Sequence, residues 1–170
     1  EYIAKRCEKD GHGLEFWEVD ILIHGNSDDM LDKDSQKFDL DKIESGYFDV
    51  HFRSPPCGSW SRAYFANDLL PQPCRDRQHP WGFPRNAGSQ RRRAERGNEF
   101  IHFSIRAIVA AQMAKQRGLQ VKSLWEHPED LGMTHRGEPA SVWQLPEVRT
   151  AFGNSRFCTV ALHQCIFKVD

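Results

Sequence analysis

The chain has 170 residues, of which 39% are hydrophobic and 28% charged, with a formal net charge of −1. This composition suits one domain with a buried core and excludes both a strongly basic tail protein and an acidic disordered chain. No apolar run approaches the ~18 residues of a membrane-spanning helix, and the first residues contain no apolar signal core. We therefore predict a single intracellular domain without a membrane span.

The cysteine pattern indicates a reducing compartment, the nucleus or the cytoplasm. The number of cysteines is odd, and no two of them form a Cys-x-x-Cys pair, so a disulfide framework and a zinc ribbon are both disfavoured. We expect reduced, mostly buried thiols at Cys7, Cys74, Cys158 and Cys165, with Cys57 as the exception.

The charges are unevenly distributed along the chain. Residues 1–50 have a balance of −8 (6 Lys/Arg against 14 Asp/Glu), whereas residues 51–170 have a balance of +7 (17 against 10). A segment at about 66–97 is rich in proline and arginine and has no apolar periodicity, which predicts a long loop. The planar guanidinium suits phosphate, so the predicted DNA contacts in this loop are Arg91, Arg92 and Arg93.

The first half of the chain predicts two strands around a helix. Residues 14–20 alternate and end in acids, which predicts a strand with Glu18 at its end. Residues 34–45 predict a helix with Phe38 and Ile43 facing inward, stopped by Gly46. Residues 48–53 predict a second strand, which ends before a pair of prolines.

The second half continues the alternation. The strongest helix signal covers 99–117, with Asn98 as its N-cap, and 121–125 reads as a buried strand. A short helix over about 140–152, interrupted by Pro146, and a last strand over 157–163 follow. This order predicts a doubly wound, mainly parallel α/β sheet.

Three polar residues fall where predicted strands end: Glu18, Cys57 and Glu126. Because ligands of such sheets bind beyond the carboxyl ends of the strands, we expect these three residues to line one edge. Pro55 and Pro56 stiffen the turn before Cys57, as a positioned nucleophile requires, while the small residues Gly58, Ser59 and Ser61 leave room for a substrate. A buried structural cysteine is the alternative.

These residues resemble a known family. Ser54-Pro55-Pro56-Cys57-Gly58-Ser59-Trp60-Ser61 resembles the nucleophile motif of DNA cytosine-5 methyltransferases, in the Pro-Pro-Cys branch of phages and eukaryotic mobile elements. Trp125-Glu126-His127-Pro128 is similar to the family's second catalytic motif, with His127 in place of an asparagine. The resemblance spans roughly residues 14–167 and implies the Rossmann-like fold of S-adenosylmethionine-dependent methyltransferases.

The resemblance also implies roles for individual residues. Cys57 would add to the 6-position of a flipped cytosine, and Glu126, preferably in a buried setting, would stabilise the developing charge. S-adenosylmethionine would contact Glu18 through its ribose, Asp29 through its adenine, and Pro55. The substrate DNA would contact Ser59, Ser61 and Arg62 in addition to the three arginines of the predicted loop.

Two family motifs are missing from this chain. The Gly-rich cofactor loop should precede Glu18, but only Gly11-His12-Gly13 lies there. A late Arg-containing motif is represented only by a lead-in at residues 163–168. We therefore expect the chain to be the central part of a methyltransferase catalytic domain.

Three other functions stay open on sequence alone. A non-catalytic nucleic-acid-binding remnant of a mobile element would explain the missing cofactor motifs. A cysteine hydrolase could pair Cys57 with His51, His79 or His127. A zinc site could use residues that lack the short spacing of a zinc finger, namely His127, His135, His163 and Cys165.

Overall fold

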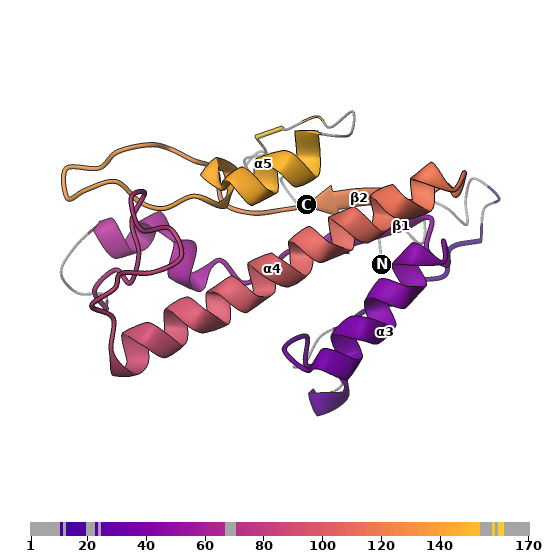
Figure 1. Ribbon diagram of the computed structural model, residues 1–170, viewed down its shortest axis with the longest axis horizontal. Helices are drawn as coiled ribbons and strands as arrows, with labels where there is room; N and C mark the ends of the chain where they lie inside the picture. The colour runs from indigo at the N-terminus through magenta and orange to yellow at the C-terminus, as the bar shows by residue number, and fades with distance from the viewer. Residues whose placement is uncertain are drawn as a thin grey trace.

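The computed structural model describes residues 11, 13–19, 23, 25–66, 71–153, 158 and 160–161. Its helices are α3 (Lys33–Glu44), α4 (Gly88–Gln116) and α5 (Pro146–Gly153), and its strands are β1 (Val50–Arg53) and β2 (Lys122–Trp125). Short 3-10 helices cover Gly25–Asp28, Gly58–Trp60, Arg62–Phe65 and Val142–Gln144. Figure 1 shows α4 crossing the whole molecule, with α3 against its C-terminal half and α5 on the other side.

Helix α4 is longer than predicted. It has 29 residues and begins at Gly88, so the predicted loop at 66–97 ends ten residues earlier than expected. The missing apolar periodicity misled the prediction, because the first turns lie largely in solvent and are stabilised by arginine's good helix propensity and the pair Arg91–Glu95. Asn98 is consequently not an N-cap but lies inside the helix.

Strands β1 and β2 form a parallel pair, so the prediction of an α/β chain with parallel strands is confirmed at this level. In their register, Phe52 is opposite Leu124 and Arg53 is opposite Trp125. One face of the pair turns His51 and Arg53 inward, whereas Phe52 and Leu124 on the other face are 63% and 58% exposed. No further strand occurs within the described ranges.

Helix α3 packs against the C-terminal half of α4 through a cluster of small side chains. Ile43 is fully buried against four alanines of α4 and Val121, because alanine lets the two helices approach closely. The predicted helix 34–45 is therefore confirmed within one residue, and Gly46 ends it with a φ of 74°. Phe38 was expected inside, but it is 53% exposed.

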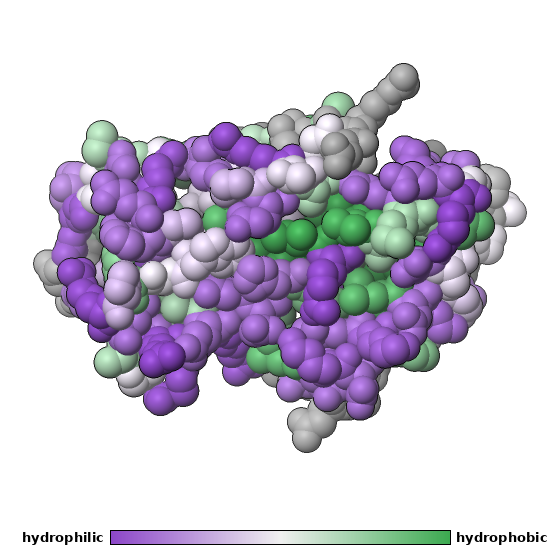
Figure 2. All heavy atoms as spheres, in the orientation of Figure 1, coloured by the Kyte–Doolittle hydropathy of each residue, from purple (hydrophilic) through white to green (hydrophobic). Residues whose placement is uncertain are grey.

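A second core lies on the opposite side of α4. Trp60 and Ile101 pack there with residues of the last described elements, namely Ala140, Val142, Leu145 and Val148. The predicted helix at 140–152 is confirmed as two pieces, because Pro146 takes the first position of α5, where its missing N–H costs no helical bond. Val109 and Met113 of α4 are exposed, and Figure 2 shows apolar side chains gathered in the middle of the face that it presents.

The predicted strand at 14–20 is wrong for its described residues. Residues 13–19 form neither helix nor strand. Trp17 instead packs edge-on against Phe38, Tyr47 and Phe48, with ring centroids 5.7–5.8 Å apart. Aromatic packing at the corner between α3 and β1 thus replaces the strand ladder that the alternation predicted. The predicted strand at 157–163 falls mostly outside the described residues.

Candidate functional site

The Cys57 turn and Glu126 follow neighbouring strand ends. The Glu126 N–H donates to the Arg53 carbonyl at 2.8 Å, which extends the strand pairing by one step. The Ser54 hydroxyl then donates to Glu126 Oε2 at 2.7 Å. Since Cys57 follows Ser54 by three residues, at most about 11 Å of chain separates the thiol-bearing residue from a direct partner of the carboxylate.

Both candidate catalytic side chains are accessible. The Cys57 thiol is free and exposed, as a nucleophile requires. Pro55 is buried, and Cys57 begins the 3-10 helix Gly58–Trp60 through a bond of 2.8 Å from the Trp60 N–H to its carbonyl. Glu126 is also exposed, whereas the family resemblance favoured a buried acid. Both side chains are therefore accessible to solvent, on segments that follow the ends of β1 and β2.

Arg75 fixes the turn after Cys57 against α4. Its guanidinium is 1% exposed, and Nη2 donates to Ser59 Oγ at 3.1 Å and to the Ala94 carbonyl at 2.8 Å. Nη1 donates to the Pro80 carbonyl at 2.6 Å and to Asn98 Oδ1 at 2.8 Å. The four acceptors are neutral and come from the turn, the 74–87 segment and α4. One side chain therefore joins three parts of the chain.

Gly97 allows the Cys57 turn and Arg75 to pack closely against the backbone of α4. A Cβ placed on Gly97 would overlap the Ser59 hydroxyl and would lie 3.2 Å from Arg75 Nη2. Glycine inside a helix normally costs about 0.5–1 kcal/mol relative to alanine, so its presence in α4 needs a packing reason. The close approach of the Cys57 turn to the helix backbone supplies that reason.

Trp60 connects the Cys57 turn to the segment after Glu126. The Arg75 guanidinium carbon lies 3.9 Å from the Trp60 ring centroid, a cation–π contact in the buried core. Trp60 also meets Trp81 and His127 edge-on, with ring centroids 5.9 and 6.4 Å away. His127 directly follows Glu126, so the two candidate catalytic segments share one aromatic core.

His127 is buried and uncharged. It is 8% exposed, and neither ring nitrogen has a hydrogen-bond partner among the described residues. Burial lowers the pKa of His127 to about 4, and the nearby positive charge of Arg75 acts in the same direction. His51, on the inner face of β1, likewise has its pKa lowered to about 4 by burial. Both imidazoles are therefore neutral at physiological pH.

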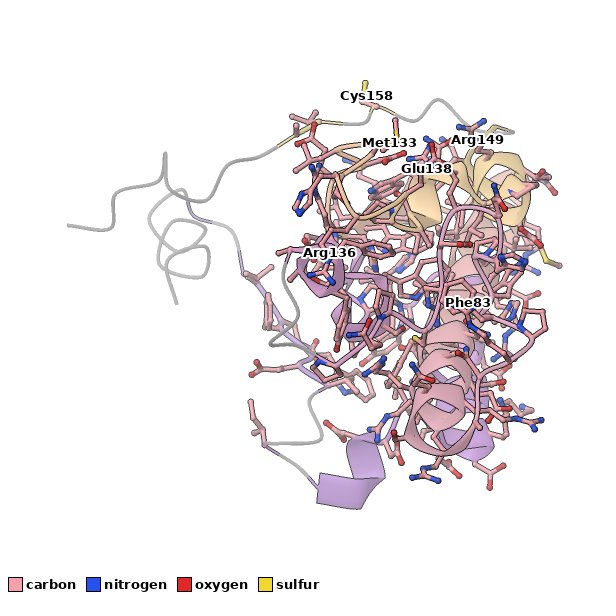
Figure 3. The ribbon with its side chains drawn as sticks, turned by 90° about the vertical axis from the view of Figure 1, so that its left-hand side faces the viewer. Phe83, Met133, Arg136, Glu138, Arg149 and Cys158 are labelled. Carbon is pink, nitrogen blue, oxygen red and sulfur yellow. The ribbon has the colours of Figure 1, made fainter. Side chains whose placement is uncertain are left out.

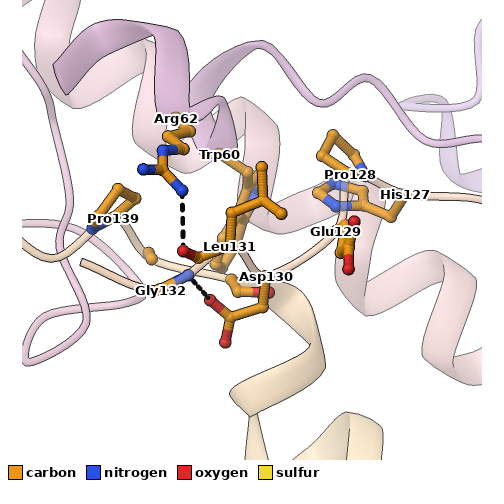
Figure 4. A pocket seen from close by; sticks show the side chains of 11 residues that line it. Trp60, Arg62, His127, Pro128, Glu129, Asp130, Leu131, Gly132 and Pro139 are labelled. Carbon is orange, nitrogen blue, oxygen red and sulfur yellow. Dashed lines mark hydrogen bonds between the residues drawn. The ribbon is translucent and has the colours of Figure 1, made fainter. Parts of the chain in front are cut away.

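A small cavity lies between Trp60 and the 127–132 segment. It encloses about 20 Å³, which is the space of a single water rather than of a nucleobase. Figure 4 shows the Arg62 side chain over this cavity, with Nη1 donating to the Leu131 carbonyl at 2.8 Å. Asp130 accepts from the Gly132 N–H at 3.0 Å in the same view. A nucleobase could therefore meet the open edge at Cys57 but not enter this cavity.

The 126–141 segment is held in place by residues near the Cys57 turn. Arg77 pairs with Asp130 at 2.8 Å, and its N–H donates to the Glu138 carbonyl at 3.0 Å. Gly137 lies against the Phe65 ring, where an added Cβ would be 3.3 Å from a ring carbon. Figure 3 looks onto this end of the molecule, with Arg136 and Glu138 labelled on the segment.

Three of the predicted DNA contacts form hydrogen bonds within the protein. Ser59 is buried and its hydroxyl accepts from Arg75, while Ser61 Oγ accepts from the Ala63 N–H at 3.1 Å. Both hydroxyls therefore hold the turn. Arg62 holds the carbonyl of Leu131.

The three successive arginines do not share one direction. Consecutive helical residues point about 100° apart, so Arg91, Arg92 and Arg93 cannot all face the Cys57 mouth. Arg91 pairs with Glu95, and Arg93 donates to the Gln72 carbonyl at 2.5 Å and covers the Tyr64 ring. Arg92 is exposed, as is Arg96 one turn later. As DNA contacts these arginines were expected to be exposed, which is wrong for the half-buried Arg93.

No contact found in the described part of the chain joins Glu18, Asp29 and Pro55, the three residues expected to hold S-adenosylmethionine. Glu18 is not at a strand end, and its neighbour Trp17 contacts Tyr47 and Phe48, which precede β1, whereas Cys57 follows it. The Asp29 carboxylate accepts from the Leu31 N–H at 2.9 Å in a local turn before α3. Pro55 alone lies beside the Cys57 edge. The expected common edge is thus confirmed for the Cys57 turn and Glu126 but not for Glu18.

The histidine-based alternatives gain no support from the contacts. His51 lies 2.5 Å from Ser123 Oγ, His79 is 3.1 Å from Asp76, and His127 sits among tryptophans, so none is bonded to Cys57. Within the described ranges no three metal-binding side chains gather, while His163 and Cys165 lie outside them. The described helices also include none with the length and apolarity of a membrane span.

Sequence reasoning missed the residues that organise this site. Arg75 stands among seven arginines of the 74–97 stretch, and nothing in the sequence distinguishes it from Arg77. Trp60 stands out only as part of a motif, and Gly97 only as the end of a predicted loop.

Comparison of the chain with family models, curated proteins and solved structures gives no match in any of the three.

The buried histidines predict an acid-sensitive fold. In the unfolded chain imidazoles titrate near pH 6.5, so below that pH the unfolded state binds protons that the folded state rejects. Stability should be fully present above about pH 6.5 and fall by up to about 1.4 kcal/mol per histidine and pH unit toward pH 4. Urea unfolding at about pH 7, 5.5 and 4.5 measures this fall.

The variant His127→Gln should make the fall shallower, because one of the two proton acceptors is removed. His135→Gln, at an exposed position, should leave the slope as in the wild type. An equal slope for all three proteins would contradict the neutral buried state of His127.

Proposed function

We propose that this chain is the central part of a DNA cytosine-5 methyltransferase-like domain, related to mobile elements, whose Cys57 attacks a flipped cytosine. One observation supports the proposal above the others. An exposed thiol and an exposed carboxylate follow the ends of two paired parallel strands, and Ser54 bonds the carboxylate from the thiol's own turn. Cys57, Cys74 and Cys158 are free thiols, and the proposal includes action in a reducing compartment, the nucleus or the cytoplasm.

The chemistry follows from the two side chains. The Cys57 thiolate forms a bond to C6 of the cytosine, and the electron pair of the C5–C6 double bond moves into the ring toward N3. Glu126, in its protonated form, donates a proton to N3 and so neutralises that charge. The ring is now nucleophilic at C5. C5 then takes up a proton from solvent, and the loss of one of the two C5 protons, the expulsion of the thiolate from C6 and the return of the N3 proton to Glu126 restore the aromatic base.

The described residues do not assemble a site for S-adenosylmethionine. Glu18 adjoins the aromatic corner before β1, whereas the Cys57 turn follows β1, and the Asp29 carboxylate is bonded to the Leu31 N–H in the turn before α3, so we derive no step through this group. A Rossmann-like sheet of the methyltransferase type belongs to the proposal, because a single parallel strand pair flanked by helices is compatible with part of such a sheet.

A second candidate function is sequence-tolerant nucleic-acid binding without catalysis. The unassembled cofactor residues favour it. Exposed arginines on α4 and the excess of positive charge after residue 50 would provide phosphate contacts. The two candidates differ in whether Cys57 forms a bond to cytosine.

Hydrogen exchange at the cytosine C5 position tests the first candidate without a methyl donor. While Cys57 is bonded to C6, solvent can protonate C5, and elimination then removes the original hydrogen. We expect DNA with tritium at C5 of cytosine to release it in the presence of the protein. Cys57→Ser should abolish the release, since an unactivated hydroxyl is a poorer nucleophile at neutral pH.

Cys158→Ser changes the other exposed thiol among the described residues and should leave the release unchanged. Thermal unfolding should show that Cys57→Ser is folded. Release that persists in Cys57→Ser would reject Cys57 as the nucleophile, and DNA binding without release by the wild type would favour the non-catalytic candidate.

DNA binding should depend on the open arginines of α4. Replacing Arg92 and Arg96 by Ala should weaken binding and lower the slope of log affinity against log salt by about one for each phosphate that is no longer neutralised. Arg117→Ala, at the far end of α4, is the matched control because Arg117 pairs with Glu44. Titration of a fluorescent duplex at several salt concentrations measures the slope. An unchanged slope would mean that Arg92 and Arg96 are only solvated.

A further inference from the structure

We propose that Arg75 is a positioning residue for Cys57, and that its buried guanidinium holds the nucleophile turn in its reactive geometry. The inference rests on the proposed function of Cys57 as the attacking group. It assigns to Arg75 a role through Ser59, which lies two residues after Cys57 in the same turn.

The setting of Arg75 is unusual for a cation. Buried charges in proteins are normally paired with an opposite charge, because removal from water is costly. Among the described residues no carboxylate pairs with Arg75. Its two terminal nitrogens bond the carbonyls of Pro80 and Ala94, the Asn98 amide and the Ser59 hydroxyl, the Cys74 side chain lies close by, and its buried Nε has no partner within the described ranges. Burial lowers its pKa to about 10, which still leaves the group charged at neutral pH.

An apolar side chain would fill this position at a lower cost in desolvation. The burial of an unpaired charge costs free energy, so filling the core alone does not explain an arginine at this position. The guanidinium offers what an apolar side chain lacks, a planar fork with fixed donor directions. It places the Ser59 hydroxyl relative to Ala94 and Asn98 of α4 and stacks on Trp60 at 3.9 Å.

Asn98 connects α4 to the 74–87 segment independently of Arg75, so the contribution specific to Arg75 is its bond to the Cys57 turn. Asn98 accepts from Arg75 and donates through Nδ2 to the Trp81 carbonyl at 2.7 Å, so α4 and the 74–87 segment form a rigid frame. Ser59 is the one acceptor of Arg75 that lies outside this frame. That bond and the close fit at Gly97 hold Ser59 against α4, next to the core contacts of Trp60.

Chemical rescue tests the proposal. Arg75→Ala removes the fork and should lower the rate of tritium release from cytosine by about 100-fold, the cost of misplacing a reacting group by about 1 Å. The loss should fall on kcat, with KM for DNA little changed, because Arg75 does not touch DNA in this arrangement. Millimolar ethylguanidinium should restore most of the rate, and ethylammonium at equal ionic strength should not. Arg117→Ala is the matched arginine control.

An unchanged rate in Arg75→Ala would overturn the proposal, as would a loss confined to KM or a loss that ethylammonium restores as well as ethylguanidinium does. Arg75→Ala also removes core packing, so a milder variant is needed in case it does not fold. Ser59→Ala deletes only the hydroxyl, and Ser104→Ala is its control, since Ser104 is a buried serine of α4 whose hydroxyl bonds the Phe100 carbonyl.

Amide hydrogen exchange measures the local stability of the Cys57 turn without an activity assay. Ser59→Ala should speed exchange in a peptide covering residues 54–61 by about three- to tenfold, the effect of removing one hydrogen bond, while Ser104→Ala leaves that peptide as in the wild type. Equal exchange in the three proteins would overturn the positioning role. If the wild type releases no tritium, the proposed function fails, and the exchange result still decides whether Arg75 orders the turn.

Discussion

The buried guanidinium of Arg75 and its neutral acceptors hold the candidate site to the rest of the molecule. Helix α4 has no side chain at Gly97, where the Cys57 turn packs on it, so the helix itself contributes no side-chain hydrogen bond to the turn at that position. The Arg75 guanidinium orients the turn on α4, because it bonds Ser59 of the turn as well as Ala94 and Asn98 of the helix. Trp60 contacts both Arg75 and the ring of His127, which lies just after the end of β2. A thiol and a carboxylate are therefore presented together from strands that pair over only four residues each.

The candidate catalytic edge and the expected cofactor site depend on different parts of the chain. The Cys57 turn and Glu126 depend on local pairing and on the core around Trp60, and both are present within the described residues. Cofactor binding would depend on the segment around Glu18, which is tied to the aromatic corner before β1 instead. The neutral buried His127 occupies the position where the resembling family has an asparagine, and it packs rather than bonds. The proposed reaction therefore rests on the edge, not on a completed cofactor pocket.

The elements that could be predicted from the sequence are those whose signals are local. Helix α3 with its Gly46 stop, both strands and Pro146 at the start of α5 follow from periodicity, capping and proline geometry. The parallel edge that brings Cys57 toward Glu126 followed from strand order. The start of α4 was missed because its first turns carry charge rather than an apolar stripe, and Phe38 was misplaced because its partner is the exposed ring of Trp17. Arg75 could not be found, since its burial depends on contacts with residues 16 and 23 positions away.

A double-mutant cycle between Gly97 and Ser59 tests the central claim most directly. Urea unfolding would give the free energies of the wild type, Gly97→Ala, Ser59→Ala and the double variant. The account predicts that Gly97→Ala destabilises the wild type by about 1–3 kcal/mol through overpacking against the Ser59 hydroxyl. In the Ser59→Ala background the same change should become neutral or stabilising, as alanine normally is inside a helix. Equal effects of Gly97→Ala in both backgrounds would contradict the close fit of the turn on α4.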